Sequence, residues 1–327
     1  MASKNGEASG NQTHWTQVQE NGTVLGIKIL LAIYSVFGRT IFTLILAPVM
    51  AYYYFASSVA RNASKQYIKY ITPYLSPNQA KELSTFKHFM QFGQMMLDKL
   101  LVWMGKIDAN DIVFQTPSVV DNIKRQTRGT VIIVSHLGNI EVCNALRQKL
   151  DAVKLTIIVN TQHAQKFNSL MKQLNNESQA ELLQVNDLSP ATAMLLSERI
   201  DRGEMIVIAG DRTPEKNERV SNVEFLGHQT SLPQGPFILA SLLKCPVHLL
   251  FCLKQGRKYH IYVDVFSEQL KFARKTREAS LDMVVQEFAD RLAHYCQIAP
   301  LQWFNFFPFW SVTKLEGKEK KTMSVLK

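Results

Sequence analysis

An uninterrupted apolar segment near the N-terminus constrains this chain more than any other feature. No charged residue lies between Thr40 and Ala60, and Arg39 and Arg61 flank the segment. As a helix it would extend about 31 Å, which matches the hydrocarbon core of a bilayer. Buried helices of soluble proteins rarely contain so long an uncharged run. Because the apolar pattern begins near Leu25, the sequence predicts a membrane-anchoring segment over residues 24–60.

The charges around this segment indicate its type and orientation. Residues 1–23 form a polar lead that carries both signs of charge, unlike the basic start of a cleavable signal peptide. Arg61, Lys65 and Lys69 follow the segment with no acidic residue among them, which places the rest of the chain in the cytoplasm. Pro48 and the three tyrosines after it also suit an interfacial or re-entrant helix. Spanning and monotopic anchoring therefore both remain open.

The later part of the chain alternates between short β-branched runs and amphipathic stretches. The predicted strands are Thr130–Ser135, Leu155–Asn160, Leu182–Asn186, Met205–Ala209, Val247–Cys252 and Tyr259–Phe266, and the predicted helices cover about 139–150, 163–175, 190–203, 233–244 and 278–297. This alternation predicts an α/β domain with a central, largely parallel sheet flanked by helices. We expect this domain over 129–310, a helical region packed on it over 61–128, and a basic tail over 311–327.

Composition narrows the function classes. The chain has 37 basic and 27 acidic residues, a formal net charge of +10, so its surface should attract an anionic partner. The basic residues are dispersed and form no nucleic-acid recognition motif, so we expect no nucleic-acid partner. The 4 cysteines have neither zinc-ligand spacing nor a disulfide framework. We expect no metal and no cofactor.

The chemically suggestive motif is Ser-His-Leu-Gly-Asn-Ile-Glu at residues 135–141, directly after a predicted strand. In α/β sheets, ligands meet the chain at the carboxyl ends of strands, where His136 would lie. His136 and Glu141 can converge if Gly138 permits a turn, Asn139 caps the next helix and Glu141 lies in its first turn. A single histidine is more often structural, but its position, the turn and the acidic partner together favour a catalytic role.

These residues resemble the bacterial lipid A biosynthesis acyltransferases of the lysophospholipid acyltransferase superfamily, which carry a His-x4-Asp/Glu motif. The similarity covers roughly residues 24–310 and continues in order along the chain: Gly210-Asp211-Arg212, Phe225-Leu226-Gly227 with Thr230, Gly235 with Leu239-Ala240, Pro246-Val247 and Gln302-Trp303. The N-terminal part looks most similar to predicted acyltransferases of specialised fatty-acid and aryl-polyene lipid clusters.

The resemblance implies a membrane-associated acyltransferase that moves a fatty-acyl chain from a thioester to a hydroxyl or amine of a lipid or glycolipid. His136 would be the general base, Glu141 would tune or orient it or act through a water, and Arg212 would stabilise negative charge. The expected substrate-binding residues are Asn139, Asp211, Arg219, Thr230 and Gly235. The alternative interpretations are a surface pair of Asp211 with Arg212, and a place for Arg219 in a solvated charged loop.

The implied partners are a lipid acceptor, the membrane and an acyl donor. Acyl carrier proteins are acidic and suit the basic surface, while acyl-CoA fits the charge equally. The implied location is the bacterial inner membrane with the catalytic domain facing the cytoplasm. The alternative is a non-catalytic membrane lipid-binding protein that retains the acyltransferase fold.

Overall fold

The computed structural model describes residues 24–143, 154–159, 181–184, 190–212 and 219–310. The helices of eight or more residues are α1 (Val24–Ala56), α2 (Ser58–Ile71), α4 (Thr85–Trp103), α5 (Pro117–Arg125), α8 (Pro190–Asp201), α9 (Gly235–Leu243) and α10 (Arg277–Ile298), and α3 (Pro77–Glu82) is shorter. The strands are β1 (Ile112–Phe114), β2 (Val131–Val134), β3 (Leu155–Val159), β4 (Glu181–Gln184), β5 (Met205–Ala209), β6 (Val220–Phe225), β7 (His228–Pro233), β8 (Val247–Gln255) and β9 (Lys258–Ser267).

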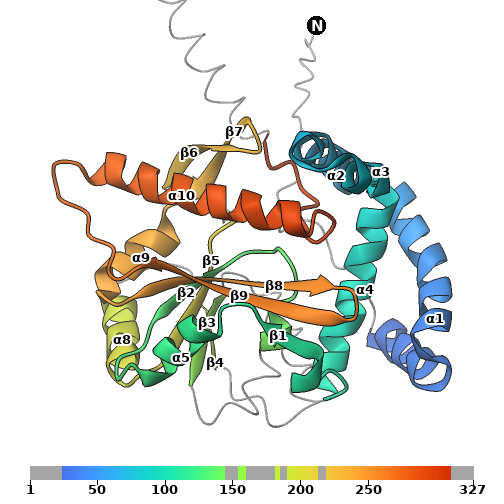
Figure 1. Ribbon diagram of the computed structural model, residues 1–327, viewed down its shortest axis with the longest axis horizontal. Helices are drawn as coiled ribbons and strands as arrows, with labels where there is room; N and C mark the ends of the chain where they lie inside the picture. The colour runs from blue at the N-terminus through green and yellow to red at the C-terminus, as the bar shows by residue number, and fades with distance from the viewer. Residues whose placement is uncertain (1–23, 144–153, 160–180, 185–189, 213–218, 311–327) are drawn as a thin grey trace, which may run out of the picture.

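The central sheet has the order β1-β9-β8-β2-β5-β3-β4. Strands β8, β2, β5, β3 and β4 are mutually parallel, whereas β9 runs antiparallel to β8 and carries β1 in parallel at its outer side. The described part of the chain is thus an α/β fold with a largely parallel sheet, as predicted. Helix α10 crosses one face of the sheet and α5 lies against the other (Figure 1).

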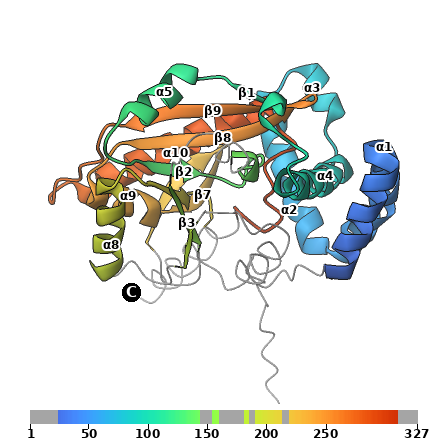
Figure 2. The same ribbon diagram turned by 90° about the horizontal axis from the view of Figure 1, so that it is seen from below.

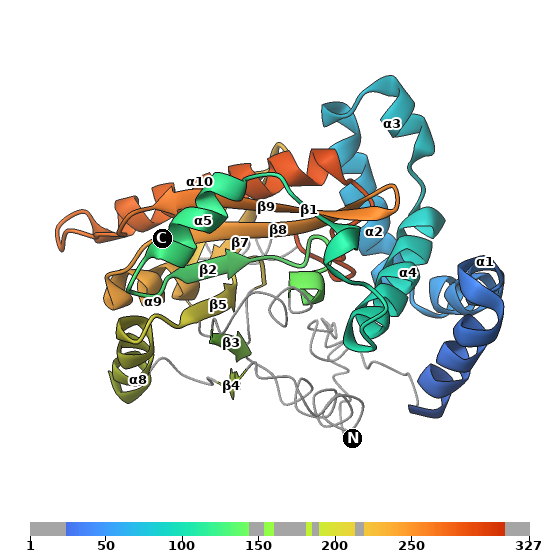
Figure 3. The same cartoon turned by 60° about the horizontal axis from the view of Figure 1, so that its bottom comes forward.

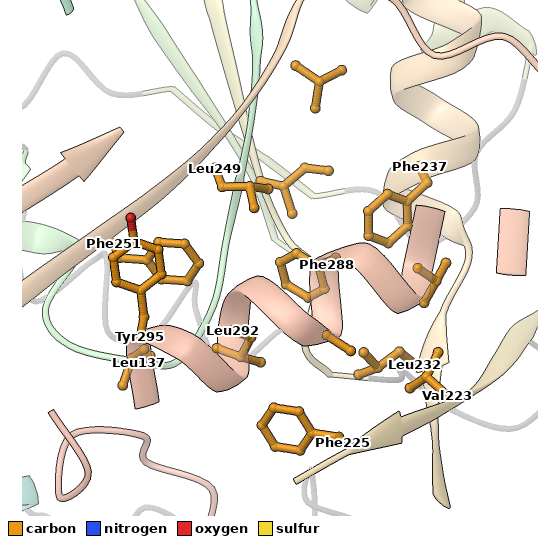
Figure 4. Packing of buried hydrophobic residues seen from close by; sticks show 14 of the residues in the cluster. Leu137, Val223, Phe225, Leu232, Phe237, Leu249, Phe251, Phe288, Leu292 and Tyr295 are labelled. Atoms are coloured by element: carbon orange, nitrogen blue, oxygen red, sulfur yellow. The ribbon is translucent and has the colours of Figure 1, made fainter. Parts of the chain in front are cut away.

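The apolar side chains of β2, β8, α9 and α10 form the main core. Phe237 of α9 contacts Phe288 of α10 at 5.6 Å between ring centroids, and Phe251 of β8 stacks on Tyr295 at 4.1 Å. Figure 4 shows these rings on the inner side of α10, with Leu137 close to Phe251 and Tyr295. The residue that follows His136 is therefore fixed in the core.

The predicted elements agree with most of these elements, with three differences. Helix α1 ends at Ala56 and α2 begins at Ser58, because Ser57 Oγ accepts a hydrogen bond from the Ala60 N–H and caps α2. The apolar run to Ala60 is therefore two helices, where one segment was expected. Strand β1 and the β6–β7 hairpin were not predicted. The helix expected at 163–175, most of that at 139–150 and the tail lie outside the described residues.

Helix α1 lies at one edge of the molecule, opposite α8 and α9 (Figures 1 and 2). The part of α1 from Tyr34 to Ala56 has a mean hydropathy of 1.4, and 17% of the residues in its most apolar stretch are buried. Among the described residues, this is the one helix that is long and apolar enough to cross a membrane. Gly38, at φ 71° and ψ −170°, interrupts the helical conformation within this part, two residues before the uncharged run that begins at Thr40. The inner side of α1 packs on α4.

Candidate active site

The loop after β2 holds His136 in a conformation that only glycine at position 138 allows. Gly138 has φ +77°, and a Cβ there would lie 2.0 Å from the carbonyl oxygen of Cys252. The Gly138 N–H donates to the Gln302 carbonyl, and the Asn139 N–H donates to the Cys252 carbonyl, both at 2.9 Å. The loop is therefore clamped between β8 and the segment that follows α10.

Asp211 is the carboxylate that contacts His136. Strand β5 lies beside β2, with Val134 opposite Ala209, so the residues after both strands meet at one edge of the sheet. His136 Nδ1 lies 2.8 Å from Asp211 Oδ1, and the His136 backbone N–H donates to Asp211 Oδ2, also at 2.8 Å. Trp303 Nε1–H donates to the same Oδ2 at 3.1 Å. Because an ionised carboxylate only accepts, this arrangement assigns the proton of a neutral imidazole to Nδ1.

The opposite nitrogen of His136 is the chemically useful one. Nε2 has no hydrogen-bond partner within the described ranges, and the side chain is 36% exposed. Desolvation and the nearby Arg212 and Lys99 charges lower the pKa of His136, although Asp211 acts in the opposite direction. The imidazole is therefore neutral near pH 7, with a lone pair on Nε2 that can accept a proton.

The Asp211 carboxyl is ionised despite its burial. Desolvation acts to raise its pKa, but the contacts with His136 and the Arg212 charge outweigh it and lower the pKa below the usual value. A buried carboxylate that holds Nδ1–H fixes both the tautomer and the orientation of the ring.

Arg212 lies beside this pair and is held by the segment after α10. Its Nη2 donates to the Phe304 carbonyl at 3.2 Å, and its guanidinium carbon lies 5.6 Å from the ring centroid of Phe307. The Phe304 N–H donates in turn to the His136 carbonyl at 3.0 Å. One short segment thus contacts both the histidine and the arginine.

Glu141 lies on the same loop but pairs with a residue of α4. Its Oε1 is 3.1 Å from Lys99 Nζ, and both side chains are about four-fifths buried. The sequence assigned Glu141 to orient His136, and the structure has Asp211 on the Nδ1 side. Asn139 is almost fully buried, and its side-chain nitrogen has no hydrogen-bond partner in the described part of the chain.

The other predicted substrate-binding residues occupy different environments. Thr230 is fully buried, and its hydroxyl donates to the Phe309 carbonyl at 2.9 Å. Gly235 begins α9. Arg219 is exposed, and its carbonyl accepts the Gln234 N–H. These contacts of Thr230 and Arg219 involve Phe309 and Gln234, so the substrate-binding roles of both residues stay predictions.

The sequence did not identify Trp303 and Lys99 as parts of the site, nor Asp211 as the partner of His136. A usable signal existed for Asp211, because it follows a buried strand by two positions, as His136 does. That signal becomes specific only when the two strands are known to be neighbours.

Helices α2 and α4 cover the edge of the sheet at which these residues meet. His88 of α4 lies 3.0 Å through Nε2 from the Trp303 carbonyl and 2.9 Å through Nδ1 from Ser64 Oγ of α2. Burial lowers the pKa of His88 to about 4, so it is a neutral structural histidine near pH 7. Figure 3 shows β2 and β5 directed toward the side on which α2 and α4 lie, with α1 outside α4. The apolar helix is thus on the same side of the sheet as His136.

Comparison with protein families gives a match over most of the chain. The family model described as bacterial lipid A biosynthesis acyltransferase matches residues 9–311. A search of curated proteins found no match.

Proposed function

The chain belongs to the bacterial lipid A biosynthesis acyltransferase family, and we propose that it moves a fatty-acyl chain from an acyl thioester to a hydroxyl or amine of a lipid or glycolipid. Membership makes it an acyltransferase of a typically membrane-associated family. The donor, the acceptor and the catalytic residues are the proposal. The observation that carries it is the His136–Asp211 pair, with Nδ1 held by a buried carboxylate and Nε2 open.

His136 acts as the general base in this mechanism. Its Nε2 takes the proton of the acceptor hydroxyl while the hydroxyl oxygen attacks the thioester carbonyl carbon. The tetrahedral intermediate collapses as the carbon–sulfur bond breaks, and the imidazolium returns the proton to the departing sulfur. The products are the acylated acceptor and a free thiol. Asp211 stabilises the transient imidazolium and keeps Nε2 directed at the acceptor.

Arg212 supplies positive charge close to the reacting atoms. A guanidinium stays charged throughout, and its planar array of donors suits an oxyanion or a phosphate. Its contacts with the Phe304 carbonyl and the Phe307 ring fix the side chain before substrate binds, so little reorganisation is needed during the reaction.

Glu141 supports His136 indirectly. It holds Lys99 Nζ, whose charge contributes to the lowered pKa of His136. Through Lys99 or a bound water, Glu141 keeps the imidazole neutral and ready to accept a proton. Asn139, with its buried side-chain nitrogen, is the proposed donor toward substrate in the same loop.

The donor is an acyl carrier protein in this proposal, with acyl-CoA as the alternative. The net charge of +10 favours encounter with an acidic carrier protein. The acceptor reaches the site from the bilayer, since α1 lies on the side of the sheet where His136 is. We further propose the bacterial inner membrane as the location, with the catalytic domain in the cytoplasm.

The test is an acyl-transfer assay with purified full-length protein in lipid vesicles, run in parallel with acyl carrier protein and CoA thioesters. His136→Ala should lower the rate by about 10²–10⁴, or about 2.7–5.4 kcal/mol in the barrier. The control is His294→Ala on the exposed side of α10, which should retain the parent rate. A folded His136→Ala protein with a parent-like rate refutes the general base.

A second arm of this assay tests Glu141. Glu141→Gln should lower the rate at least about tenfold, a barrier increase of about 1.4 kcal/mol. Thermal unfolding is followed for each variant, so that loss of activity is separated from loss of fold. An unchanged rate would remove Glu141 from the mechanism and leave Asp211 as the residue that supports His136.

A further inference from the structure

Helix α1 has two apolar faces that point in opposite directions. Phe42, Leu46 and Met50 recur every four residues and are at most 5% exposed. At 100° per residue, a second set of apolar residues lies on the opposite, outward side of the helix and forms an outer stripe. That outer stripe consists of Ile41, Leu44, Pro48, Tyr52 and Phe55, and of these Leu44, Tyr52 and Phe55 are 67–75% exposed.

The inner face is packed closely on α4. A Cβ added to Gly93 would lie 2.9 Å from Met50 Sδ and 3.0 Å from Leu46 Cδ1, so the absence of a side chain in α4 lets the helices approach. Tyr54 contacts the rings of Phe86 and Phe89 at 5.8 and 5.5 Å. The contact therefore extends along most of the uncharged part of α1.

The buried carboxylate of Asp98 attaches α1 to the sheet. Arg39 Nη2 lies 2.5 Å from Asp98 Oδ1 of α4, and Lys254 Nζ of β8 lies 2.5 Å from Asp98 Oδ2. The Tyr259 hydroxyl of β9 donates to the same Oδ2. One carboxylate thus joins α1, α4 and two strands, so α1 is part of the folded domain.

These contacts determine how α1 can meet lipid. If α1 crossed a bilayer with this packing intact, α4 would enter the hydrocarbon beside it, together with exposed charges such as Lys87, which pairs with Glu82. Moving such charges from water into hydrocarbon is unfavourable. Leaving the packing instead would expose the Arg39–Asp98 pair and the Gly93 contact.

The charges at the C-terminal end of α1 suit a phospholipid surface. Arg61 donates to the carbonyl of Tyr54 at 2.5 Å, and Lys65 and Lys69 are exposed on α2. Basic residues beside an apolar face add electrostatic attraction to anionic headgroups. Tyr52 carries a polar hydroxyl on an apolar ring, as is typical of interfacial positions.

We propose that α1 lies flat in one leaflet of a bilayer containing anionic phospholipid, with its outer stripe in the acyl chains and its inner face on α4. This is monotopic attachment rather than a crossing. The inference concerns membrane geometry alone and stands or falls separately from the proposed reaction.

The first experiment locates the two ends of the full chain. Epitope tags at the N-terminus and after Lys327 are tested for protease accessibility in sealed inverted membrane vesicles. Monotopic attachment places both tags on the same accessible side. Tags on opposite sides, or a chain that remains in the soluble fraction, would overturn the proposal.

The second experiment measures depth along α1. Nitroxide labels are attached to Ile41→Cys and, separately, Tyr52→Cys in a Cys143→Ser background, which removes the partly exposed native thiol. A flat helix gives the two labels similar depths in vesicles, whereas a crossing helix separates them by about 16 Å at 1.5 Å per residue. The larger separation refutes the flat orientation.

A matched pair of charge substitutions tests the stripe. Leu44 and Met194 are each 67% exposed, but Met194 lies on α8 at the far end of the molecule. Leu44→Glu should reduce binding to anionic vesicles at least tenfold, while Met194→Glu should not. Equal binding of both variants would show that the outer stripe is not the membrane contact.

Discussion

Two buried carboxylates of this protein have the same number of hydrogen-bonded partner groups but support different things: one holds the fold together, and the other holds an imidazole that can accept a proton. Asp98 and Asp211 have side chains that are 1% and 2% exposed. Asp98 accepts from Arg39, Lys254 and Tyr259. Asp211 accepts from the ring and the backbone N–H of His136 and from Trp303. Burial and partner number therefore do not distinguish a purely structural carboxylate from one that the proposed mechanism uses.

The nature of the partners makes the difference. Burial lowers the pKa of Lys254, and the Asp98 charge acts against that shift, while burial and Asp98 together raise the pKa of Tyr259. All three partners of Asp98 remain donors near pH 7 and have no basic lone pair to offer. The imidazole beside Asp211 is neutral, and its second nitrogen has no hydrogen-bond partner among the described residues. A buried carboxylate supports acid–base chemistry when its partner is bound through one atom and can gain or lose a proton at another, as an imidazole can.

The largest predicted effect is that of Asp211→Asn on catalysis. The amide cannot hold the Nδ1–H tautomer as a carboxylate does, so kcat should fall by about 10²–10⁴. Acyl transfer is measured at saturating donor, alongside the denaturant midpoint. A rate loss that merely follows a loss of folded protein would make Asp211 structural, like Asp98.

Asp98→Asn should show the reverse pattern. It leaves the Lys254 ammonium buried without its counter-charge, so the free energy of unfolding should fall by about 3 kcal/mol. The kcat of the remaining folded protein should stay within a fewfold of the parent. Chemical denaturation measures the first quantity. A stability equal to the parent would show that the Asp98 cluster does not attach α1.

Tyr259→Phe removes one neutral donor from Asp98 and no charge. The loss of a hydrogen bond to a buried carboxylate should reduce the free energy of unfolding by about 1.5 kcal/mol, with catalysis unaffected. Equilibrium urea unfolding of this variant and of Asp98→Asn should rank them in that order. The opposite ranking would contradict the assignment of Asp98 as the centre of the cluster.

The smallest predicted effect is a pair of opposite shifts in pH dependence. His136 must be neutral to act as base, so kcat/KM should fall as pH decreases through its lowered pKa. Arg212→Met removes a charge that lowers this pKa, and the acidic limb should move to higher pH by less than about one unit. Asp211→Asn should move the residual activity's limb to lower pH, whereas Asp98→Asn should leave it in place. Shifts in the same direction for Arg212→Met and Asp211→Asn would exclude His136 as the titrating base.

The sequence predicted the sheet well because its strands are β-branched runs buried on both faces. The run before His136 appears as β2, and Met205–Ala209 has the same bounds as β5. Strand β1 has three residues and, among the described strands, pairs with β9 alone, so its pattern is too short to detect. The capped break at Ser57 depends on one hydroxyl within an otherwise uncharged run.

The site was only partly predictable for a topological reason. Glu141 is near His136 in sequence, so local spacing favoured it. Asp211 is 75 positions away from His136, and its contact depends on β5 pairing with β2. Asp98 lies in an apolar helical pattern, and a single acidic residue in such a pattern is expected to face solvent. Only its distant partners in α1, β8 and β9 show that it is buried.

The hydrogen bonds from residues 302–304 to the His136 loop also set the order in which this protein becomes functional during synthesis. On the ribosome α1 emerges first, and its outer stripe is available to lipid before the sheet exists. His136 and Asp211 follow, but the Gly138 N–H, the Asp211 carboxylate and the His136 carbonyl obtain their partners only when Gln302, Trp303 and Phe304 have been translated. Under the proposed attachment, α1 can meet the bilayer before residues 302–304 complete the hydrogen bonds that hold the His136 loop.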